Sequence, residues 1–483
     1  MKRPSSLFLL ARRSHSYITT PIFYVNAAPH LGHLYTVVLA DAIHRWRRLR
    51  DPNGLHLFAT GTDEHGIKIL RAAERAGQNP LKFCDETSGS FRNLFSKFDI
   101  LNTDFIRTTE VRHKQCVEYV WKRLCDQNVI YKDTYSGWYS VVDECFFPNN
   151  EVEDSALGKV VKGTNTIVEW IEEENYMFRL SSYKRTVEDW LKNSDVIYPE
   201  IYLPSALNIL EFEGDLSVSR CRTRLPWGVP VPGDHSQTIY VWLDALLNYL
   251  SVVGYPAALK AWPPTCQILG KDILRFHAFY WPALLMAMGL ALPQKLLIHG
   301  HWLVGKTKMS KSLGNVVDPL DASKLYTTDG LRYFLLKQGL PSGDCDFSDE
   351  KALNVINSDL VNNIGNLLSR STVRKLNPSQ SYPRFSEDIA DSRVMKSAIP
   401  LIKELEEMRE KSLQFYDDML FYKAIERIMA GLKSGNSFFQ STEPWKLRDR
   451  LALHTVLYIT YETLRVSSIL LQPIMPTLAD HCL

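Results

Sequence analysis

The chain has 483 residues, too many for one hydrophobic core, and its length predicts about three domains. A hydrophobic content of 45% and a charged content of 23% indicate an ordinary globular protein, and a formal net charge of +2 excludes a broad basic surface for nucleic acid. Eight cysteines without a CxxC pair argue against a disulfide scaffold and a four-cysteine zinc site, and no apolar run is long enough to predict a membrane-spanning helix.

The first 16 residues have the composition of a mitochondrial presequence. Four basic residues stand among serines and leucines, and no acidic residue precedes Asp41. A ragged basic N-terminus is one alternative. A secretory signal is another, but the apolar segment is very short, and the cysteine pattern favours a reducing compartment. We therefore expect residues 1–16 to direct the chain to the mitochondrial matrix.

Strands and helices alternate in the pattern that follows. Residues 17–24 (YITTPIFY) predict a strand, and apolar residues recur at helical spacing from His33 onward. Residues 55–60 (LHLFAT) predict a second strand, followed by a turn at 61–66 (GTDEHG) and another helix. This order is typical of a parallel α/β sheet, whose ligands bind beyond the carboxyl ends of the strands.

Aromatic and acidic residues then break this alternation, which predicts an insertion into the sheet domain. The α/β pattern returns at residues 239–243, 267–269 and 296–299, and from about residue 352 the pattern is nearly all helical. The predicted units are residues 1–16, 17–125 and 215–312 (the two halves of the sheet domain), 126–214 (the insertion), 313–350 (a linker) and 351–483 (the helical domain).

Two histidines lie three residues apart in His30-Leu31-Gly32-His33, directly after the first predicted strand. In the first turn of a helix the unpaired backbone N–H groups favour anions, and two imidazoles there can donate hydrogen bonds to phosphates. Reactions at phosphorus depend on such positioning and charge stabilisation. The alternative is that both histidines only cap the helix or lie on the surface.

A second motif, residues 308–312 (KMSKS), places two lysines around a serine in a loop that contains glycine. Lys308 and Lys311 can reach a pyrophosphate leaving group as point charges, although a solvated basic loop would have the same composition. Found in this order, each beside a strand end, the two motifs together predict a site that contacts a triphosphate from both ends.

These motifs resemble the two signatures of the class I aminoacyl-tRNA synthetases, and the residues between them resemble the methionyl enzymes, especially the mitochondrial members. The resemblance covers nearly the whole chain after Tyr17. It implies a Rossmann-like parallel-sheet catalytic domain with an inserted connective domain, followed by an all-α anticodon-binding bundle. It also implies a methionine–tRNA ligase that uses ATP and Mg²⁺ to form methionyl-adenylate and then charges tRNA(Met) for mitochondrial protein synthesis.

The resemblance assigns residues to the ATP site. It implies catalytic roles for His30, His33, Lys308 and Lys311. Asp272, in the segment Gly270-Lys271-Asp272-Ile273, would accept hydrogen bonds from the ribose. The full set of ATP-binding residues implied in this way is His30, Gly32, His33, Gly270, Asp272, Lys308, Ser310 and Lys311.

The resemblance also implies a methionine pocket, in which Asp63 would hold the substrate ammonium and His277 would offer a weak polar donor. A thioether is polarizable and gains from aromatic faces, which suits such a pocket. On spacing alone, Trp242 and Tyr249 are equally compatible with core packing. The residues assigned to methionine are Ile22, Tyr24, Asp63, Trp242, Ala245, Tyr249, Ile273 and His277.

The helical domain resembles a bundle that reads a CAU anticodon with an Asn and an Arg four residues apart and a Trp after Pro. Here these residues are Asn366, Arg370 and Trp445. Residues 351–483 hold 17 Lys and Arg against 15 Asp and Glu, so affinity for phosphate must come from clusters such as Arg370, Arg374 and Lys375. An alternative for Trp445 is a hydrophobic lid on the bundle.

The insertion departs from the family pattern. Zinc knuckles are common there in the family, but residues 137–150 contain only Cys145, so we expect no bound metal. Arg220 lies where the family has an arginine near the active site. We expect no appended tRNA-binding domain of the kind that dimerises some relatives, and mitochondrial members usually run somewhat beyond Leu483. We therefore expect a monomer with an incomplete or alternative C-terminus.

Three other functions fit parts of this pattern. A cysteinyl or valyl class I synthetase would be supported by a zinc-binding cysteine set or a long editing insertion. A catalytically silent tRNA-binding protein would not need both histidines and both lysines. A tRNA-free nucleotidyltransferase would not need the long helical region.

Overall fold

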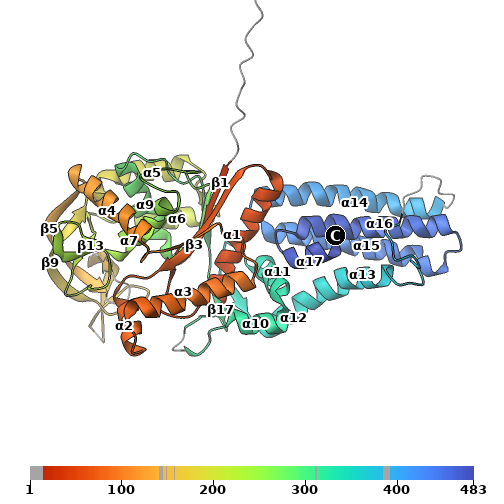
Figure 1. The fold of residues 1–483 in the computed structure, drawn as a ribbon, viewed down its shortest axis with the longest axis horizontal. Coiled ribbons are helices and arrows are strands. Elements are labelled where there is room, and N and C mark those ends of the chain that lie inside the picture. The colour runs from red at the N-terminus through yellow and green to blue at the C-terminus, as the bar shows by residue number, and fades with distance from the viewer. Residues whose placement is uncertain (1–14, 141–144, 148, 157, 311–312, 384–391) are drawn as a thin grey trace, which may run out of the picture.

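The computed structural model describes residues 15–140, 145–147, 149–156, 158–310, 313–383 and 392–483. The molecule is elongated, with an α/β region at one end and a helical bundle at the other (Figure 1). Within the described part of the chain, no helix is both long and apolar enough to cross a membrane. Residues 1–14 of the predicted presequence lie outside the described residues.

A parallel sheet forms the centre of the α/β region. Its strand order is β10-β16-β15-β1-β3-β2, β4 also pairs with β3, and every pairing is parallel. The strands are β1 (His15–Thr19), β2 (Phe23–Tyr24), β3 (Leu55–Asp63), β4 (Asp104–Arg107), β10 (Ile197–Tyr198), β15 (Cys266–Gly270) and β16 (Leu296–His299). The prediction of a Rossmann-like parallel sheet is confirmed.

Two boundaries of this sheet differ from the prediction. Strand β1 begins at His15 and pairs that residue with Leu55, so a presequence boundary after residue 16 falls inside the strand. The predicted strand at 17–24 is two strands, with a break at residues 20–22. Pro21 lacks a backbone donor and interrupts the ladder, and this break lets Ile22 line a cleft.

Helices cover the sheet on both sides. Helix α1 (Leu31–Arg50) packs on it through a mostly buried face, and α2 (Ile67–Arg75), α3 (Pro80–Lys97) and α4 (Val111–Asp126) follow in the chain. After the insertion come α7 (Val241–Leu246), α8 (Asn248–Val252), the π-helix η5 (Phe276–Tyr280) and α9 (Trp281–Ala287).

The insertion is built from antiparallel strands. Its largest sheet has the order β11-β9-β5-β6, from β5 (Ile130–Ser140), β6 (Cys145–Phe147), β9 (Glu169–Phe178) and β11 (Leu216–Ser217). A hairpin follows β6, made of β7 (Val152–Ser155) and β8 (Gly158–Val161). Helices α5 (Lys184–Asn193) and α6 (Leu203–Ile209) lie in the same region.

Two sequence predictions for this region are wrong. Residues 239–243 do not return to the parallel sheet: β14 (Asp234–Ile239) pairs antiparallel with β12 (Ser219–Cys221) and β13 (Pro230–Val231), and α7 starts at Val241. Conversely, β10, inside the predicted insertion, is an edge strand of the parallel sheet. Two-residue strands are too short to produce a recognisable period in the sequence.

A small sheet and two helices connect the α/β region to the bundle. Strand β17 (Trp302–Val304) pairs with β18 (Thr307–Lys308) and β19 (Cys345–Phe347), and α10 (Pro319–Tyr326) and α11 (Thr328–Gln338) lie between them in the chain. The prediction of an all-α C-terminal region is confirmed by α12 (Asp349–Ile356), η7 (Asn357–Gly365), α13 (Asn366–Ser371), α14 (Ser392–Asp417), α15 (Phe421–Thr442), α16 (Arg450–Leu471) and α17 (Pro476–Cys482).

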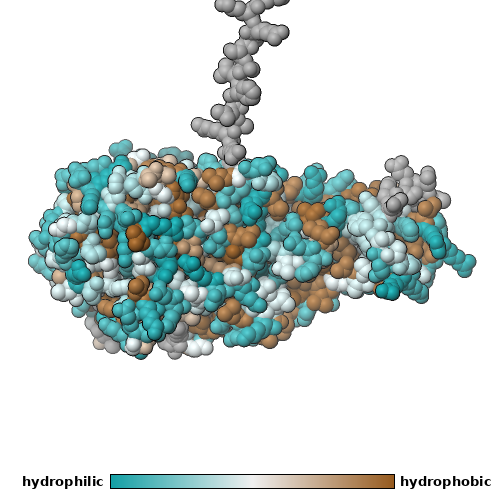
Figure 2. Space-filling view, viewed as in Figure 1, coloured by the Kyte–Doolittle hydropathy of each residue, from teal (hydrophilic) through white to brown (hydrophobic). Residues whose placement is uncertain are grey.

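A fully buried arginine joins the bundle to the α/β region. Arg332 of α11 forms an ion pair with Asp41 of α1 at 2.6 Å and donates hydrogen bonds to the backbone carbonyls of Phe98, Pro473 and Ile474. One hydrophobic core runs from the sheet into the bundle. In the view of Figure 2, hydrophilic residues dominate the surface of the α/β end, and apolar patches interrupt it toward the bundle.

Candidate active site

A cleft of about 1040 Å³ lies at the carboxyl ends of the parallel strands. It is bounded by the ends of β2, β3, β15 and β16, the start of α1, and the strand that carries Lys308. All predicted ATP and methionine residues that the structure describes line this one cleft: Ile22, Tyr24, His30, Gly32, His33, Asp63, Trp242, Ala245, Tyr249, Gly270, Asp272, Ile273, His277, Lys308 and Ser310. Lys311 lies outside the described residues.

The two histidines of the first motif form a rigid pair at the start of α1. His30 is the N-cap residue, and its Nδ1 accepts a hydrogen bond from the Gly32 amide at 3.0 Å. His33 Nδ1 accepts from the His30 amide at 3.1 Å, and the two rings stack with centroids 3.8 Å apart. Both histidines therefore cap the helix and also line the cleft.

Both imidazoles are neutral, and their tautomer is determined by these hydrogen bonds. Burial lowers the pKa of His30 to about 4, and the nearby Lys308 and His301 act in the same direction. Burial also holds the pKa of His33 well below its usual value. Because each Nδ1 accepts from a backbone N–H, each ring carries its proton on Nε2. The pair can therefore present two N–H donors to a phosphate.

The backbone amides of this turn are not free for a ligand, contrary to the sequence expectation. The Leu31 amide donates to the Val317 carbonyl at 3.1 Å, and the His33 amide donates to the His30 carbonyl at 2.9 Å. The Gly32 amide is used by the His30 ring. Anion binding at this end of the cleft must therefore rely on side chains.

Lys308 and Asp272 meet at the same end of the cleft. Lys308 Nζ lies 3.5 Å from Asp272 Oδ2, and His301 Nε2 lies 3.1 Å from Asp272 Oδ1. Burial opposes ionisation of Asp272, but the contact with His301 and the charge of Lys308 hold its pKa well below the usual range. Asp272, assigned to ribose by resemblance, is thus also the counter-ion of Lys308.

The segment after Lys308 is shaped by a residue that the sequence analysis missed. Asn315 Oδ1 accepts from the Ser310 amide at 2.8 Å, and Asn315 Nδ2 donates to the Lys308 carbonyl at 3.3 Å. His301 was missed as well, and the histidine-rich run 299–301 after a strand could have indicated it.

The opposite end of the cleft is aromatic. Trp242 of α7 stacks on Phe276 of η5, with ring centroids 3.5 Å apart and planes within 6° of parallel. Tyr249 is buried behind them, and its hydroxyl hydrogen-bonds His277 Nε2 at 2.8 Å. These residues form a wall of the cleft, so packing and ligand contact are combined in the same side chains. Phe276 was not assigned to the pocket from the sequence.

His277 cannot supply the polar donor expected of it. Burial lowers its pKa to about 4, so the ring is neutral. Its Nδ1 lies 3.0 Å from the Ile273 carbonyl, which can only accept, so Nδ1 carries the proton. Nε2 then accepts from the Tyr249 hydroxyl. Both polar atoms of His277 are satisfied within the protein, and the pocket offers a thioether mainly apolar and aromatic contact.

Asp63 is the acidic residue at this end. It is the last residue of β3, is 8% exposed, and its carbonyl accepts from the Val25 amide at 3.1 Å. A carboxylate held on a strand end beside Tyr24 is well placed to bind a substrate ammonium group.

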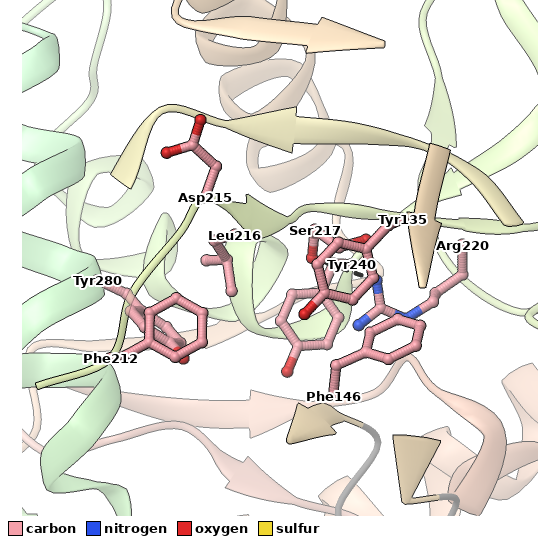
Figure 3. A pocket seen from close by; sticks show the side chains of 9 residues that line it. All are labelled: Tyr135, Phe146, Phe212, Asp215, Leu216, Ser217, Arg220, Tyr240 and Tyr280. Atoms are coloured by element: carbon pink, nitrogen blue, oxygen red, sulfur yellow. Dashed lines mark hydrogen bonds between the residues drawn. The ribbon is translucent and has the colours of Figure 1, made fainter. Parts of the chain in front are cut away.

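Arg220 does not lie in this cleft. Figure 3 shows its side chain beside the rings of Phe146 and Tyr240, lining a separate cavity of about 20 Å³. Its guanidinium lies 4.4 Å from the Tyr240 ring centroid and donates to the Ser219 carbonyl at 2.6 Å. A cavity of this size holds about one water molecule. Arg220 therefore does not line the cleft, although its neighbours Phe146 and Tyr240 directly precede the cleft residues Phe147 and Val241.

The predicted anticodon residues gather in the bundle. Arg370 Nη2 donates to Gln440 Oε1 at 2.6 Å, and its guanidinium lies 5.8 Å from the ring of Trp445. Trp445 is 40% exposed, and Asn366 lies one turn before Arg370 on α13. An exposed aromatic beside a guanidinium is suited to stacking an unpaired base.

The chain combines a parallel sheet, two helix-capping imidazoles, a lysine-bearing hairpin opposite them, and a helical bundle. This catalytic architecture is that of a class I aminoacyl-tRNA synthetase. The family model "tRNA synthetases class I (M)" matches residues 16–158 and 158–372. The chain belongs to this family, the methionyl-tRNA synthetases of class I.

Individual relatives agree with this assignment. The mitochondrial methionine–tRNA ligase of Bos taurus is 47% identical over 98% of this chain and 84% of its own length. A Mycobacterium tuberculosis methionyl-tRNA synthetase in complex with methionyl-adenylate is 36% identical, with a TM-score of 0.90 over 97% of this chain and 93% of that chain. The free form of the same bacterial enzyme has a TM-score of 0.83, covering 97% and 91% of the two chains.

Proposed function

We propose that this chain activates L-methionine with ATP to form methionyl-adenylate and then transfers the methionyl group to the 3′ end of tRNA(Met). The observation that carries the proposal is the single cleft, with a neutral histidine pair at one end and an aromatic pocket with a carboxylate at the other. The names of the relatives support the same reaction.

In this proposal each end of the cleft holds one substrate. Asp63 binds the methionine ammonium, and Trp242 and Tyr249 enclose the thioether. A carboxylate oxygen of methionine attacks the α-phosphorus of ATP, and the bond from that phosphorus to the bridging oxygen breaks, so pyrophosphate leaves with the electron pair. No proton transfer at phosphorus is needed, so catalysis depends on orientation and charge stabilisation.

In this proposal the protein supplies that stabilisation through the histidine pair and two lysines. The Nε2–H groups of His30 and His33 donate to phosphate oxygens, and Lys308 neutralises the developing charge on pyrophosphate. Lys311 has the same proposed role. We expect Mg²⁺ to enter as the ATP complex, and removal of Mg²⁺ with a chelator should abolish the reaction. Among the described residues, no group of three His, Cys, Asp or Glu side chains is arranged to hold a metal ion.

The helical bundle is the proposed site for the anticodon, with Asn366, Arg370 and Trp445 as contacts. We propose that the enzyme is monomeric, and light scattering after size-exclusion chromatography would test that state. The relative from Bos taurus is a mitochondrial enzyme. We place this chain in the mitochondrial matrix, and protease protection of imported protein would test the compartment.

Methionine-dependent exchange between ATP and labelled pyrophosphate is the decisive assay. We expect exchange with methionine and little or none with cysteine or valine. Robust exchange with either of those amino acids but not with methionine would overturn the substrate assignment. No exchange with any amino acid, together with retained tRNA binding, would instead favour the silent RNA-binding protein.

A further inference from the structure

The turn that carries Asp63 contains two more ionisable residues, Glu64 and His65, and each of the three has a different environment. Asp63 lines the cleft. Glu64 is fully buried and accepts from Arg107 Nε of β4 at 2.6 Å. His65 is 3% exposed, and its Nδ1 lies 2.6 Å from Asp244 Oδ2 on α7. The turn ends at Gly66, whose φ of +113° favours glycine.

Asp244 has a second buried partner on another helix. Its Oδ1 accepts from His113 Nε2 of α4 at 2.8 Å. His113 Nδ1 in turn lies 2.9 Å from Ser251 Oγ of α8, and the Ser251 hydroxyl donates to the Leu247 carbonyl at 3.0 Å. Asp244 is 1% exposed and His113 is fully buried. The three residues His65, Asp244 and His113, here named the His–Asp–His cluster, therefore join the β3 turn, α4 and α7.

Asp244 accepts hydrogen bonds from both histidines of the cluster, which connects the three elements firmly. Burial opposes ionisation of Asp244, but the two histidines hold its pKa well below the usual range, so it is a carboxylate and only accepts. Both histidine nitrogens that face it must donate. Hydrogen bonds from two buried histidines give the buried carboxylate of Asp244 the partners that it requires.

The cluster lies directly behind the methionine pocket. Asp63 is two residues before His65, and Trp242 and Ala245 flank Asp244 on α7. Asp63, Trp242 and Ala245 line the cleft, whereas none of the three cluster residues does. The cluster thus connects the turn that carries Asp63 to the helix that carries Trp242 and Ala245.

We propose that Asp244 is a positioning residue for the amino-acid substrate: through His65 and His113 it sets the separation between Asp63 and the Trp242-bearing helix, and so the side-chain length that the pocket accepts. This inference rests on the proposed function of the same cleft. It adds a determinant of length that touches no substrate atom.

The test compares methionine with ethionine, which has one more methylene beyond the sulfur, in the exchange assay. In Asp244→Asn, the amide N–H group of the new side chain faces the N–H group of one histidine. Because two donors then oppose each other, we expect α7 to shift. We expect the KM for methionine to rise about tenfold or more with the KM for ATP within about twofold, because small misplacements of binding groups are costly. We also expect the methionine-to-ethionine preference in kcat/KM to change by about fivefold or more, on the scale of one methylene.

Three further variants separate positioning from folding. Asp41→Asn is the matched control, because Asp41 is an equally buried carboxylate in an ion pair on α1, away from the pocket; it should leave the methionine-to-ethionine preference unchanged. His65→Ala removes only one hydrogen bond of the cluster, and it replaces Asp244→Asn as the test variant if Asp244→Asn does not fold. His65→Asn places an amide N–H where Nδ1 lies and should restore the wild-type preference.

An unchanged preference in folded Asp244→Asn and His65→Ala would overturn the inference, as would an equal change in Asp41→Asn. Either result would leave wild-type exchange with methionine intact. Absence of methionine exchange in the wild type would instead refute the proposed function, so the two failures are distinguishable.

Discussion

Replacing Gly32 by alanine should disable the nucleotide chemistry while leaving the enzyme folded. A Cβ at this position would lie 2.9 Å from His30 Cε1, closer than Cβ atoms approach other atoms in proteins, and 3.1 Å from His30 Nδ1, tighter than most such contacts. The His30 ring must therefore turn away and lose its hydrogen bond from the Gly32 amide. Its Nε2–H would no longer point where a phosphate binds.

The expected change in the free energy of unfolding is much smaller than the expected change in the activation free energy. Loss of the cap hydrogen bond costs about 1 kcal/mol, whereas alanine is favoured over glycine in a helix by about 1 kcal/mol, so stability should change little. Loss of one positioned donor to a developing charge typically costs about 3 kcal/mol, or a factor of 10² to 10³ in rate. Exchange should therefore fall by at least about 100-fold with the melting temperature nearly unchanged.

The control is Gly89→Ala in α3, where a Cβ would meet no atom within 4 Å. This variant should be slightly more stable than the wild type and should exchange pyrophosphate normally. Exchange by Gly32→Ala within about threefold of the wild type would refute the role assigned to the orientation of His30.

Three shorter predictions follow from the same geometry. Lys308→Ala should slow exchange by about 100-fold or more with methionine affinity unchanged, since this exposed side chain serves the phosphate end; calorimetry would check the affinity. Trp445→Ala should spare exchange and weaken tRNA charging, and equal loss of both would indicate a structural role. His277 has a pKa of about 4 against its usual 6.5, so its contribution to stability is complete above pH 6.5 and is lost as pH falls toward 4. Between pH 7 and pH 5 this loss is about 2 kcal/mol, and the melting temperature of His277→Gln should fall less over that range than that of the wild type.

The parts of the site that the sequence could predict are those set by local chemistry. His30 caps α1 because the capping geometry needs only residues 30–33. The cleft lies at the strand ends because parallel strands share one edge, which also brought Asp63 and Gly270 together. The assignments of Trp242 and Tyr249 needed the family resemblance, since helical spacing alone also described core packing.

The features that the sequence could not predict depend on contacts between distant segments. Asp272 binds His301 and Lys308, about 30 residues further along the chain, and nothing in its own motif indicates that pairing. The tautomer of His277 depends on Tyr249 and on the Ile273 carbonyl. The position of Arg220 was predicted from the family pattern, but in this chain three carbonyl and hydroxyl acceptors from β11 and β12 hold it in another cavity.

The buried arginine between the domains has a consequence for how the two ends of the enzyme communicate. Arg332 holds α1, whose first turn carries the histidine pair, and also holds the carbonyls of Pro473 and Ile474 at the end of the last long bundle helix. A rotation of the bundle about this joint must either drag α1 with it or break bonds to a charge that has no access to water. The bundle and the α/β region are thus coupled through one buried side chain. We expect a catalytic fragment cut away from the bundle to lose part of the support of the helix that carries the histidine pair.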